Sequence, residues 1–336
     1  MSIAENSRGM SYRYGLLFLI ALIWGSQFLF NHLALKVFTP ESVAWLRAAI
    51  GFITLSLVMS VSRSFAVSRS DSGSRSDSVS RSSPSSAASA DSSARQGSGS
   101  RYWLQIILVG FFEATLPFFL VAWGQQHVNS AVAAILMSLV AIFTLVLVVI
   151  FVRDEPVTKG KFIGIMLGFV GVVVLLWPQF SQSTGSGSVL GSLAILAAAM
   201  SFAVSLILIR RLPQIGSPVV TARNILFCGA VELGGVLLLM RQPLIHQPLQ
   251  SDAVLALLAQ GVLAGGVVYV LYVRLVAVAG ATFAGFANYL VPIVGVFLGV
   301  VFLRDQLPIS AYFSILILAL AIFACEWKPT RLPAGD

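Results

Sequence analysis

The sequence has few charged residues. Asp, Glu, Lys and Arg make up 10% of its 336 residues, apolar residues make up 57%, and the mean hydropathy is +0.91. A water-soluble globular chain carries about 25% charged residues, so the composition excludes that class and indicates an integral membrane protein. The excess of 21 Lys and Arg over 13 Asp and Glu therefore concerns the sidedness of the loops and does not indicate nucleic-acid binding.

Residues that build metal sites, disulfides and catalytic centres are also scarce. Both cysteines, Cys228 and Cys325, lie in apolar runs, and the three histidines, His32, His127 and His246, have no metal-binding or catalytic spacing. The sequence contains no nucleotide-binding loop. We therefore expect no metal, no cofactor and no enzymatic activity. The apolar start lacks a small-residue cleavage site, which predicts a retained first helix.

Long apolar runs are abundant. A helix of roughly 20 residues crosses a ~30 Å hydrocarbon core, and ten such runs are present. Because they are continuously apolar, they favour helices over barrel strands. The expected spans are residues 14–35, 42–61, 103–123, 130–152, 160–177, 189–210, 219–240, 253–275, 282–303 and 309–327.

A Ser- and Arg-rich tract, at about residues 63–101, separates the second and third spans. It is too polar and too repetitive to bury apolar surface, which predicts a disordered cytoplasmic loop. The tract is interpreted as a tolerated insertion. A phosphorylation or partner site, or a contact with anionic lipid headgroups, stays open.

A short charged hinge occurs twice. Phe-Val-Arg-Asp-Glu-Pro at 151–156 returns as Phe-Leu-Arg-Asp-Gln-Leu at 302–307, 151 positions later, and the same offset aligns Gly110 with Gly261. The chain is therefore predicted to be an internal duplication. The acidic hinge residues are interpreted as solvated loop residues that favour a helix start.

Each predicted repeat, residues 1–178 and 186–328, holds five spans, and an odd number of spans gives an inverted-topology repeat. With the N-terminus cytoplasmic, the cations fall on the inner side sixteen to three, which predicts that both termini are cytoplasmic in a cell inner membrane. The inner cations are Arg8, Arg13, Arg63, Arg69, Arg75, Arg81, Arg95, Arg101, Arg153, Lys159, Lys161, Arg210, Arg211, Arg274, Lys328 and Arg331; the outer ones are Lys36, Arg241 and Arg304.

Two motifs carry a family likeness. Ala-Leu-Ile-Trp-Gly-Ser-Gln-Phe at 21–28 and Thr-Pro-Glu-Ser-Val-Ala-Trp-Leu-Arg at 39–47 resemble the start of the EamA-type transporters of the drug/metabolite transporter superfamily. The likeness extends over nearly the whole chain apart from the Ser/Arg tract. It implies two inverted five-helix repeats around a central cavity, alternating access, and transport of small polar metabolites, most often amino acids.

The sequence departs from that family at two places. Both hinges have Arg-Asp where the family usually has Gly-Glu, and Ala141 stands where a proline is common, although the second copy keeps Pro292. The resemblance implies that the first, third, fourth, sixth, eighth and ninth spans line the cavity.

Two carboxylates lie deep inside spans, where a charge costs about 2.5–3.5 kcal/mol on insertion scales. Glu113 is midway along the third span and is predicted to couple transport to protons or to bind a substrate amine; a purely structural role stays open. Glu232, in the seventh span, has the weaker case because its glycine neighbours also suit close helix packing.

Three arginines are candidate gate or anion-anchoring residues. Arg47 and Arg223 occupy matched positions near the starts of the second and seventh spans, and Arg274 lies at the inner end of the eighth. Each is a candidate for a gate salt bridge or for binding a substrate carboxylate. The alternative for Arg47 and Arg223 is that they snorkel to the headgroups.

Polar and aromatic side chains recur at helical spacing on three spans, and such a face points away from lipid. These candidate substrate contacts are Trp24, Gln27, Asn31, Tyr269, Tyr272 and Asn288. Helix packing is the alternative reading.

The sequence thus predicts a secondary transporter of small metabolites, exporting amino acids or related compounds by alternating access with proton coupling. An uncoupled facilitator is one alternative. A membrane scaffold or receptor acting through the Ser/Arg loop is the other.

Overall fold

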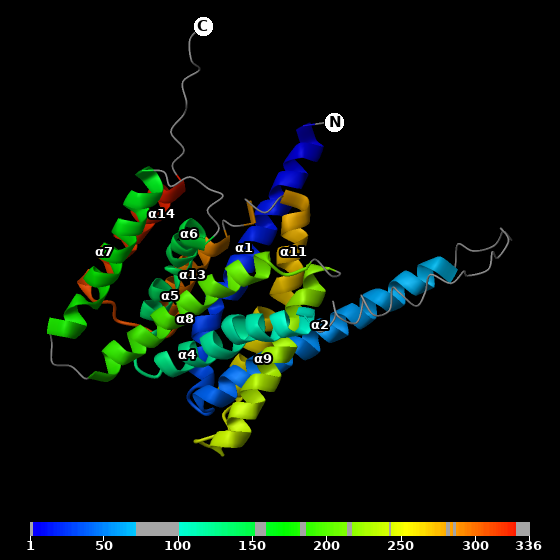
Figure 1. Cartoon of the computed structure of the whole chain (residues 1–336), viewed down its shortest axis with the longest axis horizontal. Coiled ribbons are helices and arrows are strands. Elements are labelled where there is room, and N and C mark those ends of the chain that lie inside the picture. The colour runs from blue at the N-terminus through cyan, green and yellow to red at the C-terminus, as the bar shows by residue number, and fades with distance from the viewer. Residues whose placement is uncertain are drawn as a thin grey trace, which may run out of the picture.

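Ten helical spans make up the molecule. The computed structural model describes residues 3–71, 101–151, 159–181, 186–213, 217–241, 243–279, 283–284 and 287–326. Within them, seven helices are long and apolar enough to cross a membrane. Three shorter apolar helices, Phe162–Leu175, Leu290–Phe302 and Ile309–Ala321, occupy the fifth, ninth and tenth expected positions. The all-helical membrane fold is confirmed, and the beginning of α1 and the end of α14 lie at the top of Figure 1.

Six spans are single helices, and the third, fourth and eighth are divided. The single ones are α1 (Ile3–Ala34), α2 (Pro40–Asp71), α7 (Lys159–Ser181), α8 (Ser186–Arg210), α9 (Pro218–Met240) and α14 (Ile309–Glu326). The ninth span is α13 (Ala287–Phe302), preceded by residues outside the described part. The fourth span consists of α5 (Ser130–Met137) and α6 (Val140–Phe151).

The third and eighth spans each contain a π-helical segment. The third has a helix at 101–110, then η1 (Phe111–Thr115) and α4 (Leu116–Gly124); the eighth has α10 (Ser251–Ala259), η2 (Gln260–Val267) and α11 (Val268–Ala279). The duplication offset of 151 carries 111–115 onto 262–266, inside η2. Widened turns of this kind are rare and often lie at functional sites.

The Ser/Arg tract differs in part from its prediction. α2 continues to Asp71, past the expected end at 61, so the first residues of the tract extend the helix. Residues 72–100 lie outside the described residues.

The helix neighbours follow the internal duplication. α1 packs on α13 and on the eighth span, and its counterpart α8 packs on α6 and on the third span. The first helix of each repeat therefore packs mainly against helices of the other repeat. α2 also packs on η2, while three further pairs, α2 with α9, α5 with α13 and α7 with α14, join a helix to its own counterpart. The α7–α14 pair forms the left edge of Figure 1.

Matched helices run in opposite directions. Along α2 and α9, Trp45 lies beside Gly234, and further on the Phe52 ring lies 5.2 Å from the Phe227 ring. Residue numbers thus rise along one helix while they fall along the other. This antiparallel crossing is the geometry of an inverted repeat.

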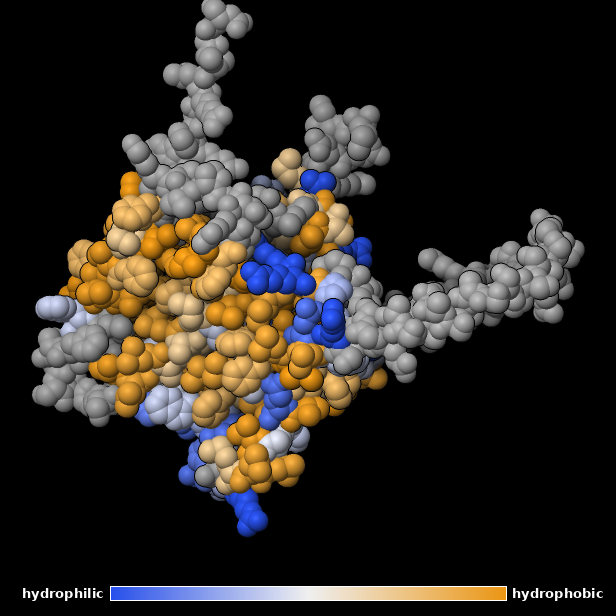
Figure 2. All heavy atoms as spheres, in the orientation of Figure 1, coloured by the Kyte–Doolittle hydropathy of each residue, from blue (hydrophilic) through white to orange (hydrophobic). Residues whose placement is uncertain are grey.

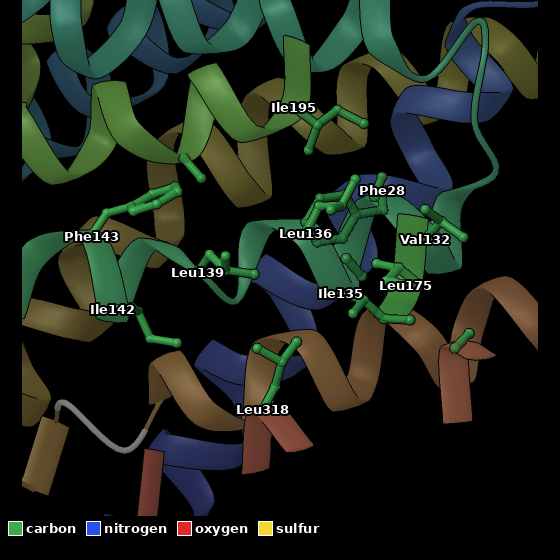
Figure 3. Packing of buried hydrophobic residues seen from close by; sticks show 14 of the residues in the cluster. Phe28, Val132, Ile135, Leu136, Leu139, Ile142, Phe143, Leu175, Ile195 and Leu318 are labelled. Atoms are coloured by element: carbon green, nitrogen blue, oxygen red, sulfur yellow. The ribbon is translucent and has the colours of Figure 1, made fainter. Parts of the chain in front are cut away.

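The surface and the interior are both apolar, as expected in lipid. Figure 2 shows a largely hydrophobic face, with hydrophilic residues at the lower end of the view and in patches toward its upper right. Inside, α5 and α6 pack against α1, α7, α8 and α14 through a buried cluster (Figure 3). Its labelled members are Phe28, Val132, Ile135, Leu136, Leu139, Ile142, Phe143, Leu175, Ile195 and Leu318.

The fourth span breaks although it lacks the expected family proline. The Ser138 hydroxyl donates to the Ile135 carbonyl at 2.6 Å, and the Ser138 and Leu139 backbone N–H groups turn back to carbonyls three residues earlier. A serine that bonds back to its own helix in this way bends it. Pro292, by contrast, lies within continuous α13.

The second hinge connects the two repeats. Asp305 accepts a hydrogen bond at 2.9 Å from the backbone N–H of Ala131 in the first turn of α5, and Asn129 donates to the Gln306 carbonyl at 3.4 Å. Arg304 adopts a left-handed φ of 55° where the chain turns after α13. The interpretation of Asp305 as a solvated loop residue is therefore wrong, because its carboxylate caps a helix of the other repeat. The first hinge, residues 152–158, lies outside the described residues.

Candidate functional site

The π-helical turn of η1 directly precedes Pro117. The Leu116 N–H donates to the Phe111 carbonyl, five residues back. In this register the next N–H would pair with the Phe112 carbonyl, but proline has no N–H. The Ser201 hydroxyl from α8 donates to that carbonyl at 2.7 Å instead. A side chain of the second repeat thus satisfies a carbonyl that the turn leaves without a helical partner.

Glu113 lies within this widened turn. The Ser205 hydroxyl on α8 donates to its carboxylate. The helix of the first repeat that carries the carboxylate therefore meets a hydroxyl from the second repeat. A carboxylate with a hydroxyl donor at the contact between the two repeats can respond to a proton or a cationic group.

Arg47 lies inside the bundle and does not extend toward headgroups. The residue is 7% exposed. Its Nη2 donates to Gln27 Oε1 on α1 at 2.6 Å, and its guanidinium lies 3.9 Å from the centre of the Phe118 ring on α4. Its Nε–H is buried without a partner among the described residues. The snorkelling interpretation is therefore wrong for Arg47, whose cation is held by an amide oxygen and an aromatic face.

Glu113 and Arg47 belong to one electrostatic cluster without forming a direct ion pair. Glu113 and Tyr269 are titratable groups that act on Arg47 across the site. The ion pair found in the described part of the chain is Lys36 with Asp252, at 4.0 Å on the surface. A buried cation that lacks a contacting carboxylate leaves a guanidinium N–H available to an anionic ligand.

Three aromatic side chains complete the cluster. The Trp24 ring on α1 lies 5.4 Å from the Tyr272 ring and 6.2 Å from the Tyr269 ring, both on α11. Edge-to-face and tilted contacts at these distances are favourable. Ring contacts thus join Trp24 to Tyr269 and Tyr272, and a hydrogen bond joins Gln27 to Arg47. Glu113 acts on Arg47 electrostatically, so six residues predicted from the sequence belong to this cluster between the repeats.

Asn31 belongs to a separate buried amide network one turn along α1. Its Nδ2 donates to Gln125 Oε1 at 2.7 Å, and its Oδ1 accepts from Gln260 Nε2 at 3.3 Å. Gln125 also donates to the Ser130 hydroxyl and to the Phe28 carbonyl, both at 3.1 Å. Gln260 is 0% exposed and its Oε1 has no partner among the described residues. Sequence reasoning missed both glutamines, although an amide within or at the end of an apolar run was a usable signal.

Two predicted residues are not joined to the cluster, and the side chain of a third is not described. Arg223 donates to its neighbour Asn224 at 2.9 Å, and Asn224 donates to Tyr102. Arg274 is exposed, with its guanidinium 5.7 Å from the centre of the Tyr12 ring on α1. The Asn288 side chain lies outside the described part of the structure.

The described residues contain no group of three His, Cys, Asp or Glu side chains able to hold a metal ion. The site is made of one buried cation, one carboxylate, aromatic rings and amides. These groups suit recognition of a small polar molecule by hydrogen bonds and stacking.

The fold and the site define a multi-pass membrane protein with a polar site inside a helical bundle. A sequence model of the EamA-like transporter family matches residues 84–177 and 189–325, one match in each repeat. The chain belongs to this family of the drug/metabolite transporter superfamily, and it is a membrane transporter, not an enzyme.

Two further comparisons agree with that assignment. A protein of Archaeoglobus fulgidus named "Uncharacterized transporter" is 29% identical over 129 residues, which are 38% of this chain and 44% of that protein. This chain therefore matches less than half of that relative's length. A solved structure described only as "Crystal structure of protein" has a TM-score of 0.57 at 18% identity and covers 94% of this chain and 95% of its own, which is a likeness of fold alone.

Proposed function

We propose that this transporter carries small metabolites bearing a carboxylate, such as amino acids or related compounds, and that it exports them across a cell inner membrane with both termini in the cytoplasm. The observation that carries the proposal is the buried Arg47, whose free Nε–H is available to a carboxylate beside the aromatic rings of Trp24, Tyr269 and Tyr272. The orientation follows from the excess of Lys and Arg in the inner segments.

The mechanism is alternating access between two states of similar energy. Inverted repeats produce such states because exchanging the conformations of the two halves converts one state into the other. The contact between α2 and α9 and the exchange of α1 and α8 between repeats support this mechanism, because the candidate site lies between elements of both halves.

Proton coupling is assigned to Glu113. Its carboxylate meets Ser205 of the other repeat and interacts electrostatically with Arg47. A proton on Glu113 removes a negative charge from this buried cluster. Protonation therefore changes the field acting on Arg47 and on a substrate anion beside it.

The test begins with metabolite profiles of cells with and without the protein, which identify compounds whose distribution changes. The purified protein in vesicles is then expected to move such a compound faster under an imposed pH gradient. Flux that ignores the gradient would replace the proposal with an uncoupled facilitator. Absence of flux, together with loss of the cellular effect on deleting residues 66–98, would replace it with a scaffold.

A further inference from the structure

Glu232 carries a carboxyl group inside a membrane span, and the mechanism proposed above gives it no role. It lies on α9, where the Thr115 hydroxyl of η1 donates to its Oε2. Its second oxygen, Oε1, is buried without a hydrogen-bond partner among the described residues. The carboxyl therefore turns toward η1, and Thr115 is the hydroxyl that binds it.

The backbones of α9 and η1 come close enough to enforce this contact. A Cβ at Gly229 would lie 2.6 Å from the Ala114 Cβ, and a Cβ at Gly110 would lie 2.9 Å from the Cys228 Cβ. Helices without side chains at the contact approach closely. Glu232, one turn beyond Gly229, is thereby held over the end of η1.

The Thr115 hydroxyl bonds differently from a threonine in a regular helix. Thr54 on α2 shows the ordinary pattern, donating at 2.8 Å to the carbonyl of Ile50, four residues back. For Thr115 the equivalent carbonyl belongs to Phe111, which already accepts the Leu116 N–H of the π turn. The hydroxyl turns outward to Glu232 instead.

We propose that Glu232 is a positioning residue for transport: by holding Thr115 it keeps η1 in its π form, and so keeps Glu113, two residues earlier, against Ser205. Without this hold η1 closes toward a regular α-helix. A π turn contains one residue more than an α turn. Closing it therefore rotates the helical segment before the turn by about 100° relative to the segment after it. That rotation would carry Glu113 away from Ser205. The role rests on the proposed function only in treating Glu113 as the coupling group.

Four variants of the full-length protein separate this role from others. Thr115→Val and Glu232→Leu each remove one side of the hydrogen bond, whereas Glu232→Gln keeps an oxygen that accepts it. Thr54→Val removes a hydroxyl that bonds only within its own helix and serves as the matched control.

The first readout is hydrogen exchange across residues 111–117 in detergent, which needs no substrate. Thr115→Val and Glu232→Leu should each speed exchange there, because a turn no longer held in its π form opens its backbone hydrogen bonds whenever it changes toward the α form. The expected factor is about tenfold, the effect of losing one hydrogen bond to a charged group. The double variant should be no faster than either single one, because both changes break the same contact. Glu232→Gln and Thr54→Val should match the wild type.

The second readout is the pH profile of transport in vesicles. Thr115→Val and Glu232→Leu should shift the profile alike, and Glu232→Gln should restore it. Unchanged exchange in the first two variants overturns the proposal. So does a Glu232→Gln variant that shifts the profile as far as Glu232→Leu, because Glu232 would then act through its own proton. If exchange changes as expected but wild-type transport does not depend on pH, Glu113 has no coupling role. The hold of Glu232 on η1 is supported in that case.

Discussion

The close contact between α2 and η2 predicts unequal effects of two glycine-to-alanine changes. A Cβ at Gly51 would lie 2.8 Å from the Gly265 carbonyl oxygen and 3.0 Å from its carbon. Both are backbone atoms, which cannot rotate aside, and contacts between carbon and oxygen are ordinarily about 3.3–3.6 Å. Gly51→Ala therefore has to push α2 away from η2 by about 0.5 Å. At Gly235 on α9, nothing lies within 4 Å of the added methyl group.

The magnitudes follow from two opposing terms. Overpacking costs about 1–3 kcal/mol, and alanine gains about 1 kcal/mol over glycine in helix propensity. Gly51→Ala should lower the free energy of unfolding, whereas Gly235→Ala should leave it equal or higher, a separation of about 2 kcal/mol. In thermal unfolding in detergent this separation corresponds to about 3 °C for a chain of this length. Equal midpoints for the two variants would refute the close backbone contact between the repeats.

Three further changes test other contacts of the fold and site. Arg47→Lys keeps the charge but loses the planar contact with Phe118, so transport should fall about thirtyfold, given about 2 kcal/mol for a desolvated cation–π contact; a wild-type rate would contradict this. Gln125→Leu leaves buried hydrogen-bonding groups unpaired at about 1–3 kcal/mol, so its thermal midpoint should fall, whereas exposed Gln126→Leu should leave it unchanged. Asp305→Ala removes the acceptor of the Ala131 N–H but leaves the N-cap Asn129, so hydrogen exchange of the Ala131 amide should quicken; normal protection there would show that Asp305 contributes nothing to the start of α5.

The fold could be predicted because its signals are local or periodic. Hydropathy gives the ten spans, and the repeated hinge gives the duplication. An odd number of spans per copy then gives the inversion, which the opposite courses of α2 and α9 bear out. Helical spacing also predicts that Trp24 and Gln27 share one face of α1. The offset between the two hinges predicts that the third and eighth spans correspond to each other in the duplication.

The site was predicted less completely because its details depend on contacts across the repeats. Spacing arguments assume regular turns, so the π turn around Glu113 could not be read from Pro117 alone. The position of Arg47 near a helix end suggests that its guanidinium contacts headgroups. In the structure the guanidinium contacts Gln27 and Phe118 instead. The cap formed by Asp305 joins residues that are 174 positions apart, a distance over which no local pattern operates.

The two glutamines of the amide network show the same limit. Gln125 and Gln260 are polar residues within or beside apolar spans, a signal that indicates burial in protein but not the partner. Their partner Asn31 was predicted as a site residue from the polar face of its own helix. The hydrogen bonds of the network depend on how the helices pack, which one helix does not show.

The most direct test of the central claim, that Glu113 couples substrate movement to protons within the inverted-repeat bundle, is pH-gradient-driven uptake in vesicles containing wild type, Glu113→Gln or Glu232→Gln. Glu113→Gln should fold normally and lose all dependence on the gradient, while Glu232→Gln should keep the wild-type response. Gradient dependence that is unchanged in Glu113→Gln would contradict the claim.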